Sequence, residues 1–205
     1  SFGEFELFEG RSTYTVAKVS IRNYFRELAA DFDTACYGFY FLEFADYYCQ
    51  ENNDETEMLK LLYQTLRALE SPAFSNRLVR CIYELKTLTI NGEAPNVFGC
   101  TKCGGKEELH WFSGKTARML CDHCVNELKR KPENMSALPT YQKVQESTVY
   151  TMQYIMTAKL AKLYTFSVSD QVLRELQQCI REYMKYYINH SFKSLKILEE
   201  VENMI

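Results

Sequence analysis

Apolar residues along most of this 205-residue chain recur at intervals of three and four, which is the period of an α-helix. The first stripe starts at about Tyr24 and predicts one long helix that carries Leu28, Phe32, Cys36, Tyr40, Phe44 and Tyr47. Further stripes predict helices that include residues 58–66, 78–88, 141–163, 172–187 and 192–201. Asn91-Gly92 ends one of these helices, and Ser167 has capping-box spacing to Asp170 before another. The pattern therefore predicts a mainly α fold.

The first 24 residues follow a different pattern, in which apolar and polar residues alternate. Phe5 and Leu7 form one alternating group, and Tyr14, Val16 and Val19 form a second, with a glycine-containing turn between them. Alternation interrupted by such a turn predicts a β-hairpin. Because a lone hairpin is marginally stable in water, we expect this one to pack on another part of the protein.

Length and charge narrow the choice of function. With 46% hydrophobic residues the chain can bury a real core, and its net charge of -3 means that any nucleic-acid surface is a local patch. There is neither an apolar run of transmembrane length nor a secretory signal pattern, so we expect no membrane partner and a cytoplasmic location. Four cysteines stand singly among apolar residues, as reduced buried thiols do.

The other four cysteines form two CxxC pairs separated by 17 residues, within residues 99–125. They are Cys100, Cys103, Cys121 and Cys124. Two tight turns of this kind direct four thiolates at one ion, so the spacing predicts a zinc site. Four cysteines close the coordination shell, and the zinc is then structural. The alternatives are a redox CxxC or disulfides, and His110 and His123 are expected to be neighbours of the site or exposed.

Basic residues are concentrated around this loop. From Cys100 to Lys131 there are seven Lys or Arg and four Asp or Glu, a difference of +3. The seven are Lys102, Lys106, Lys115, Arg118, Lys129, Arg130 and Lys131. They are candidate DNA-phosphate contacts, and Trp111 could stack on bases. The alternative is that the lysines form a solvated face and that Trp111 caps a small zinc core.

Four stretches resemble a known family. YELKTLTINGEAP, from Tyr83, matches F/Y-E-L-x-x-L-x-x-x-G-x-x-P, and YMKYYINHSFKSLKILEE, from Tyr183, matches Y-x-x-x-x-L-G-x-x-L-K-S-x-x-x-L-E-E with Asn189 at the glycine. EMLKLLYQTLRAL and FSVSDQVLREL also fit. Their order around a four-cysteine loop resembles the RecO family of recombination mediators in the bacterial RecF repair pathway, over roughly the whole chain.

The resemblance implies an OB-fold followed by a helical, zinc-containing domain. We therefore expect residues 1–24 to be a hairpin remnant that ends an OB-fold-like β domain, and residues 25–205 to be the helical domain. It further implies a DNA repair and recombination mediator at the bacterial nucleoid. Such proteins bind single- and double-stranded DNA, anneal strands, and work with RecR and single-strand-binding protein to load RecA.

The resemblance also implies a docking site for the acidic, hydrophobic C-terminal tail of single-strand-binding protein. Such a tail requires an apolar pocket beside basic side chains. Candidates on the matching helices are Arg80, Arg181, Lys193 and Lys196, which could instead be ordinary surface charges. The competing hypothesis for the whole chain is a zinc-stapled helical interaction module without direct DNA binding. We assign no catalytic residues, since the sequence has no nucleophile–base constellation and no Walker A motif.

Overall fold

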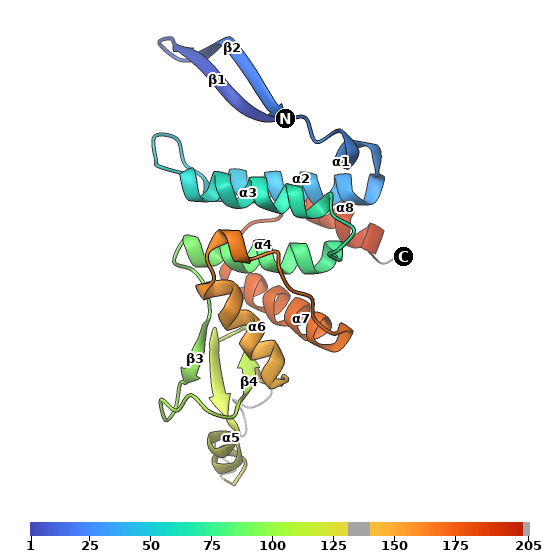
Figure 1. The fold of residues 1–205 in the computed structure, drawn as a ribbon. Coiled ribbons are helices and arrows are strands. Elements are labelled where there is room, and N and C mark those ends of the chain that lie inside the picture. Colours follow the sequence, from blue (N-terminus) through green and yellow to red (C-terminus); the bar gives the residue numbers. More distant parts are fainter. Residues whose placement is uncertain (131–139, 203–205) are drawn as a thin grey trace.

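The structure, a computed structural model, describes residues 1–130 and 140–202 (Figure 1). Its strands are β1 (Phe2–Glu9), β2 (Tyr14–Asn23), β3 (Asn96–Cys100), β4 (Leu109–Ser113), β5 (Arg118–Cys121) and β6 (Gln142–Lys143). Its helices are α1 (Arg26–Ala30), α2 (Phe32–Tyr48), α3 (Thr56–Leu69), α4 (Asn76–Ile90), α5 (Asp122–Lys129), α6 (Glu146–Thr157), α7 (Asp170–Tyr187) and α8 (Lys193–Glu202), and η2 (Leu160–Lys162) is a 3-10 turn. The prediction of a mainly α protein preceded by a β-hairpin is confirmed.

The central helix of the molecule is α4. Every residue from Leu78 to Leu88 is buried, because α2, α3, α6 and α7 all pack against it. Polar side chains on such a helix need partners inside the protein. Lys86 donates from Nζ to the carbonyl oxygens of Met156 at 3.0 Å and Ala158 at 2.8 Å, and burial lowers the pKa of this lysine. Its amine therefore ties the end of α6 to the core.

The hairpin of β1 and β2 is antiparallel, as predicted, and it projects from one end of the helical body (Figure 1). The ring of Phe2 lies 4.3 Å from the ring of Tyr63 in α3, so the base of the hairpin packs on the helices. Farther out, its large apolar side chains are exposed, namely Phe5, Leu7, Phe8, Tyr14, Val16 and Val19. A strand with alternating residues normally buries one face. The described residues leave this hairpin without a cover.

The single long helix predicted from about Tyr24 is wrong, because the chain breaks at Asp31. Asp31 has an extended backbone (φ -105°, ψ 124°) and caps α2, and its carboxylate accepts from the backbone N–H of Thr34 at 2.9 Å. Aspartate is among the residues that best stabilise this position. The break turns the apolar stripe, so that Phe32 is 70% exposed.

The helix predicted over residues 141–163 is also wrong in its extent. β6 takes the first part, and α6 ends where Ala158 becomes extended (φ -65°, ψ 143°). The amine of Lys86 satisfies carbonyl groups at this end. A long-range partner on α4 therefore stabilises an end that the local pattern does not mark.

The starts of α7 and α8 are held by different kinds of cap. In α7 the capping hydroxyl is that of Ser169, and not Ser167, and it accepts from the N–H three residues on at 3.3 Å. In α8 the cap comes from α2, where the carboxylate of Glu43 accepts from the N–H groups of Lys193 at 2.9 Å and Ser194 at 2.8 Å. Although burial acts to raise it, the pKa of Glu43 is lowered, first by a hydrogen bond from the Ser194 hydroxyl and then by these two backbone bonds. The start of α8 is thereby fixed against α2.

The chain forms a small sheet in the part of the sequence between α4 and α6, where the hydrophobic pattern predicted no strands. Its order is β3-β5-β4-β6, with β3 parallel to β5 and the other pairs antiparallel. Its β4–β5 turn touches α7 at Gly114, where a Cβ would lie 2.6 Å from the carbonyl carbon of Glu182 and 2.7 Å from the nitrogen of Tyr183. Glycine permits this close approach. We call β3, β4, β5, α5 and β6 together the metal subdomain.

Within residues 1–130 and 140–202, every helix is too short or too polar to cross a membrane.

Candidate functional site

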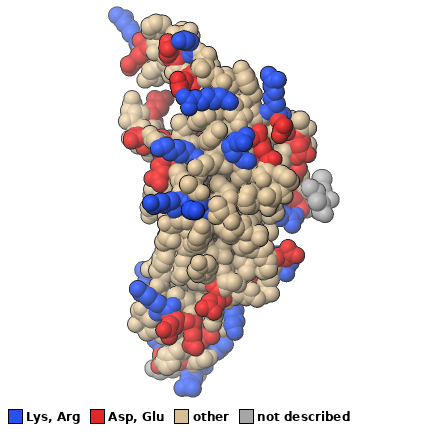
Figure 2. All heavy atoms as spheres, in the orientation of Figure 1, with Lys and Arg blue, Asp and Glu red and all other residues tan. Residues whose placement is uncertain are grey.

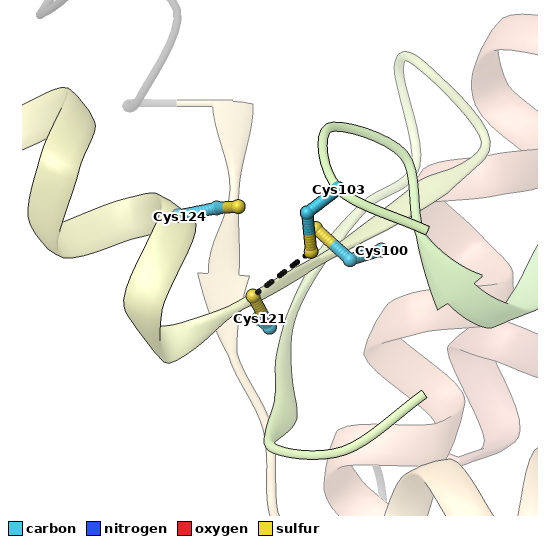
Figure 3. Close-up of side chains that lie close together, drawn as sticks. All are labelled: Cys100, Cys103, Cys121 and Cys124. Atoms are coloured by element: carbon cyan, nitrogen blue, oxygen red, sulfur yellow. Dashed lines mark hydrogen bonds between the residues drawn. The ribbon is translucent and has the colours of Figure 1, made fainter. Parts of the chain in front are cut away.

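Four cysteines converge in the metal subdomain (Figure 3). Cys100 ends β3 and Cys103 follows in the next turn, while Cys121 ends β5 and Cys124 lies in the first turn of α5. Their sulfur atoms all lie within 4.8 Å of one another, and those of Cys103 and Cys121 are 3.8 Å apart. The structure therefore brings together the four ligands that the spacing predicted.

These distances fit a tetrahedral metal site. With Zn–S bonds of about 2.3 Å, a tetrahedron separates its sulfur atoms by about 3.8 Å. A disulfide needs about 2.05 Å, and all eight cysteines are free thiols. Four thiolates prefer zinc over hard cations and leave no open position for a reacting water. The cluster is compatible with a structural metal site, and its donors favour zinc.

The backbone around the first CxxC pair prepares it for a metal. Gly104 has φ +74°, a conformation that favours glycine, and its N–H donates to the carbonyl of Cys100 at 2.8 Å. The N–H of Gly105 points at the sulfur of Cys103, 3.4 Å away. Although burial acts to raise it, backbone N–H groups, first that of Cys121, lower the pKa of Cys100 to about 6. A thiolate is the form that binds a metal.

Asp122 links the second CxxC pair to the sheet. One carboxylate oxygen accepts from the indole N–H of Trp111 at 2.7 Å, and the other lies 2.9 Å from Nδ1 of His110. Although burial acts to raise it, these two contacts lower the pKa of Asp122. His123 is exposed and faces Glu127 at 3.3 Å. As expected, both histidines are neighbours of the site and not ligands. Among the described residues, the group that could hold a metal consists of the four cysteines alone.

The six candidate DNA-contacting residues that the structure describes do not form one cluster. Lys102 pairs with Glu127 at 2.7 Å, and Lys115 lies in the β4–β5 turn beside α7, away from the cysteines. Lys129 covers the ring of Trp111 at 4.9 Å, which favours packing of this ring in the subdomain over a free stacking platform. Lys106, Arg118 and Arg130 are exposed, whereas Lys131 lies outside the described residues. On the face shown in Figure 2, basic and acidic side chains are interspersed at this end.

Three of the four candidate partner-binding residues line one cavity. It has a volume of about 290 Å³ and lies between α4, α7 and α8. Arg80, Arg181 and Lys196 contribute positive charge, and Lys185 and His190 add further nitrogen donors. The apolar part of the wall consists of Met184, Ile188, Phe192 and Leu195. We call this cavity the α7–α8 pocket. Lys193 lies at the start of α8, where its backbone is bound to Glu43.

Arg80 is more deeply placed than a surface charge. Its side chain is 7% exposed, and its guanidinium contacts Glu84 at 2.9 Å from Nε and Glu202 at 3.1 Å from Nη1. The hydroxyl of Tyr40 donates to Glu84 at 2.7 Å and that of Tyr37 donates to Glu202 at 2.5 Å. These bonds join α2, α4 and the end of α8. Arg80 therefore holds the floor of the pocket in place.

The sequence pattern did not identify several groups that complete these sites. Asp122 stands directly after a cysteine, so its position beside the metal cluster could have been inferred from spacing. Lys185 lies one turn beyond Arg181 on α7 and His190 lies in the segment between α7 and α8, so both could have been found as basic residues that follow Arg181 closely in the sequence. No local signal points to Glu43, since its partners lie 150 residues away.

Comparisons with known proteins give a consistent result. The family model described as "Recombination protein O C terminal" matches residues 29–196. Three proteins named DNA repair protein RecO are similar over nearly the whole chain. The one from Acetivibrio thermocellus is 26% identical over 204 residues, 99% of this chain and 77% of its own length. Those from Alkaliphilus metalliredigens and a Thermoanaerobacter species are 24% and 23% identical, covering 98% and 97% of this chain and 78% and 76% of theirs.

Proposed function

The chain belongs to the RecO family, and from this membership we propose that it is a non-enzymatic DNA repair and recombination mediator. In this role it docks the acidic C-terminal tail of single-strand-binding protein, works with RecR to load RecA, and promotes strand annealing at the nucleoid in the cytoplasm. The metal cluster holds zinc and serves structure. Residues 1–24 form the end of an OB-fold-like β domain. The rest of that domain covers the exposed apolar side chains of the hairpin.

The observation that carries this proposal is the chemistry of the α7–α8 pocket. The pocket is lined by apolar side chains together with the basic residues Arg181, Lys185 and Lys196. A single ligand can therefore pair its carboxylates with the basic side chains and bury a hydrophobic group in the pocket. Charged hydrogen bonds to carboxylates are about twice as strong as neutral ones, and apolar anchors in pockets supply most of the affinity in such interfaces. An acidic peptide with an aromatic end has this combination of groups.

The test is binding of a fluorescent peptide with an acidic, phenylalanine-terminated tail to the wild-type protein and to Arg181→Ala. We expect saturable binding by the wild type and a loss of about tenfold or more in the variant, since a hydrogen bond between charged groups is worth about 1.5–3 kcal/mol. Arg174→Ala, an exposed arginine on the same helix that does not line the pocket, is the matched control. Equal affinities in the three proteins would contradict the assignment of the pocket.

DNA contact is the second element of the proposal, and the exposed basic residues of α5 support it. Lys129 is the last residue of α5 and Arg130 follows it, and α5 itself lies at the tip of the molecule in Figure 1. A protein that neutralises phosphates releases counterions, so its affinity for DNA falls steeply with salt. The competing role, an interaction module without DNA binding, would show no such dependence.

We expect the double substitution Lys129→Glu and Arg130→Glu to weaken binding of a single-stranded oligonucleotide about tenfold at low salt. The slope of log affinity against log salt should become shallower by about 1.4, because each of the two lost phosphate contacts removes about 0.7. Fluorescence anisotropy across a salt series measures both quantities. The control is Lys159→Glu with Lys162→Glu, which makes the same charge change on the exposed η2 segment. Identical curves for the two double variants would favour the interaction module.

A further inference from the structure

The guanidinium of Arg80 has three nitrogen atoms, and only two of them make close contacts with carboxylates. Nε contacts Glu84 at 2.9 Å and Nη1 contacts Glu202 at 3.1 Å, and these two carboxylates are 4% and 9% exposed. Nη2 has a weaker partner in Glu199, whose Oε1 is 3.8 Å away, beyond ordinary hydrogen-bond distance. We therefore assign Nη2 of Arg80 to the α7–α8 pocket, which Arg80 and Glu199 both line.

Glu199 differs from the two buried carboxylates in its freedom to move. Its side chain is 40% exposed, and the only ion pair found for it among the described residues is the long one to Arg80. The helix that carries it is fixed independently at both ends, by Glu43 at its start and by Glu202 near its end. The Glu199 side chain can therefore leave Arg80 while α8 stays in place.

We propose that Glu199 is an affinity-determining residue of the α7–α8 pocket, whose carboxylate occupies the place beside Arg80 that a ligand carboxylate takes. This inference rests on the proposed docking of an acidic peptide. With the pocket empty, Glu199 partly neutralises Arg80. An incoming acidic peptide must displace it, and a ligand without a carboxylate at that point meets no such competitor. Glu199 thus lowers the affinity of ligands that place a carboxylate beside Arg80 and leaves that of other ligands largely unchanged.

The physical basis is competition between two like charges for one cation. A partly exposed ion pair at 3.8 Å is weak, so its loss costs the folded protein little. Two carboxylates beside one guanidinium repel each other, and like charges brought together at an interface oppose binding. Removing the charge of Glu199 while keeping its shape should therefore increase affinity for acidic ligands without unfolding α8.

The experiment compares the wild type with Glu199→Gln and Glu200→Gln, using the acidic phenylalanine-terminated peptide as the probe. Both substitutions remove one negative charge from α8, but Glu200 is exposed and does not line the pocket. We expect Glu199→Gln to bind the peptide about three- to tenfold more tightly at low salt, and the gain to shrink as salt screens the charges. Glu200→Gln should change affinity by less than about twofold.

The possible outcomes separate this inference from the proposed function. If Glu199→Gln alone binds more tightly, or if it binds where the wild type is too weak to measure, the inference stands. If all three proteins bind equally, or if the two variants gain equally, the pocket remains a docking site and the role of Glu199 is wrong. If none of them binds the peptide, both the docking proposal and the inference are overturned.

Discussion

Replacement of Cys121 by serine is expected to abolish metal binding and to release the metal subdomain from its fixed structure, while the helical core around α4 stays folded. A structural zinc ion contributes about 10–16 kcal/mol of apparent binding free energy in small peptides, which is comparable to the entire stability of a typical domain, about 5–15 kcal/mol. The subdomain contributes only a few buried apolar side chains to the core that it shares with the helices, namely Val97, Leu109, Phe112, Met119, Leu120 and Val125. So few apolar side chains cannot offset the loss of the ion.

Two measurements check this expectation. Metal content per chain should fall from about one equivalent to nearly none, as required by a site with four thiolate ligands. Amide hydrogen exchange at Phe112 in β4 should lose its protection, whereas exchange at Leu85 in α4 should stay slow. Cys49→Ser is the control, since Cys49 is a half-buried cysteine outside the cluster. Retained metal and retained protection in the Cys121 variant would contradict a structural role for the cluster.

Helix positions in this fold are largely predictable from the sequence, because burial follows the apolar period. The stripe from Leu78 to Leu88 lies in α4, and the helix ends at Ile90, just before Gly92 takes φ +73°. The apolar stripe over residues 172–187 likewise lies within the observed helix α7. The failure at Asp31 has a local reason, since the aspartate cap stabilises a helix start in the middle of a continuous stripe. Period alone does not detect a break after which the apolar spacing resumes.

The sheet of the metal subdomain was not predictable in the same way. Its strands are four or five residues long, apart from the two-residue β6, and they are stabilised by partners far apart in the chain. The pairing of Trp111 with Lys143, for example, spans more than thirty residues. Short strands of this kind carry too few alternating positions for the period to show. The cysteines were identified nevertheless, because two residues between thiolates are a chemical requirement of the metal and not a property of the strands.

The pocket illustrates the same limit for the functional site. Arg181 and Lys196 were selected from matching helices, and the structure places both on one cavity. Arg80 was selected as well, but its buried position between Glu84 and Glu202 follows only from the packing of α8 on the body. A residue that serves both the core and a binding surface has no distinctive sequence signal. Removing such a residue affects both the stability of the fold and the binding of a ligand, and the two effects can be measured separately.

Replacement of Arg80 by methionine is therefore expected to destabilise the protein strongly in addition to altering the pocket. The substitution leaves Glu84 and Glu202 in a buried environment without their cation, and breaking such a pair from one side costs about 3–5 kcal/mol. For a chain of this size each kcal/mol lowers the melting temperature by about 2–4 °C, so we expect a decrease of roughly 6–20 °C. Packing of the guanidinium on the ring of Tyr40, 5.4 Å away, is lost as well.

Thermal unfolding followed by circular dichroism measures this decrease, and Arg77→Met provides the matched control. Arg77 is an exposed arginine one turn earlier on α4, and its contact is a single bond to the backbone carbonyl of Glu202 at 3.0 Å, so its loss should cost less than about 1 kcal/mol. Adding Glu84→Gln to the Arg80 variant should recover part of the stability, because it removes the charge left unpaired. Equal melting temperatures for the two arginine variants would mean that the buried charges find other partners. Recovery in the double variant would show that the loss comes from the unpaired carboxylate and not from the missing side-chain volume.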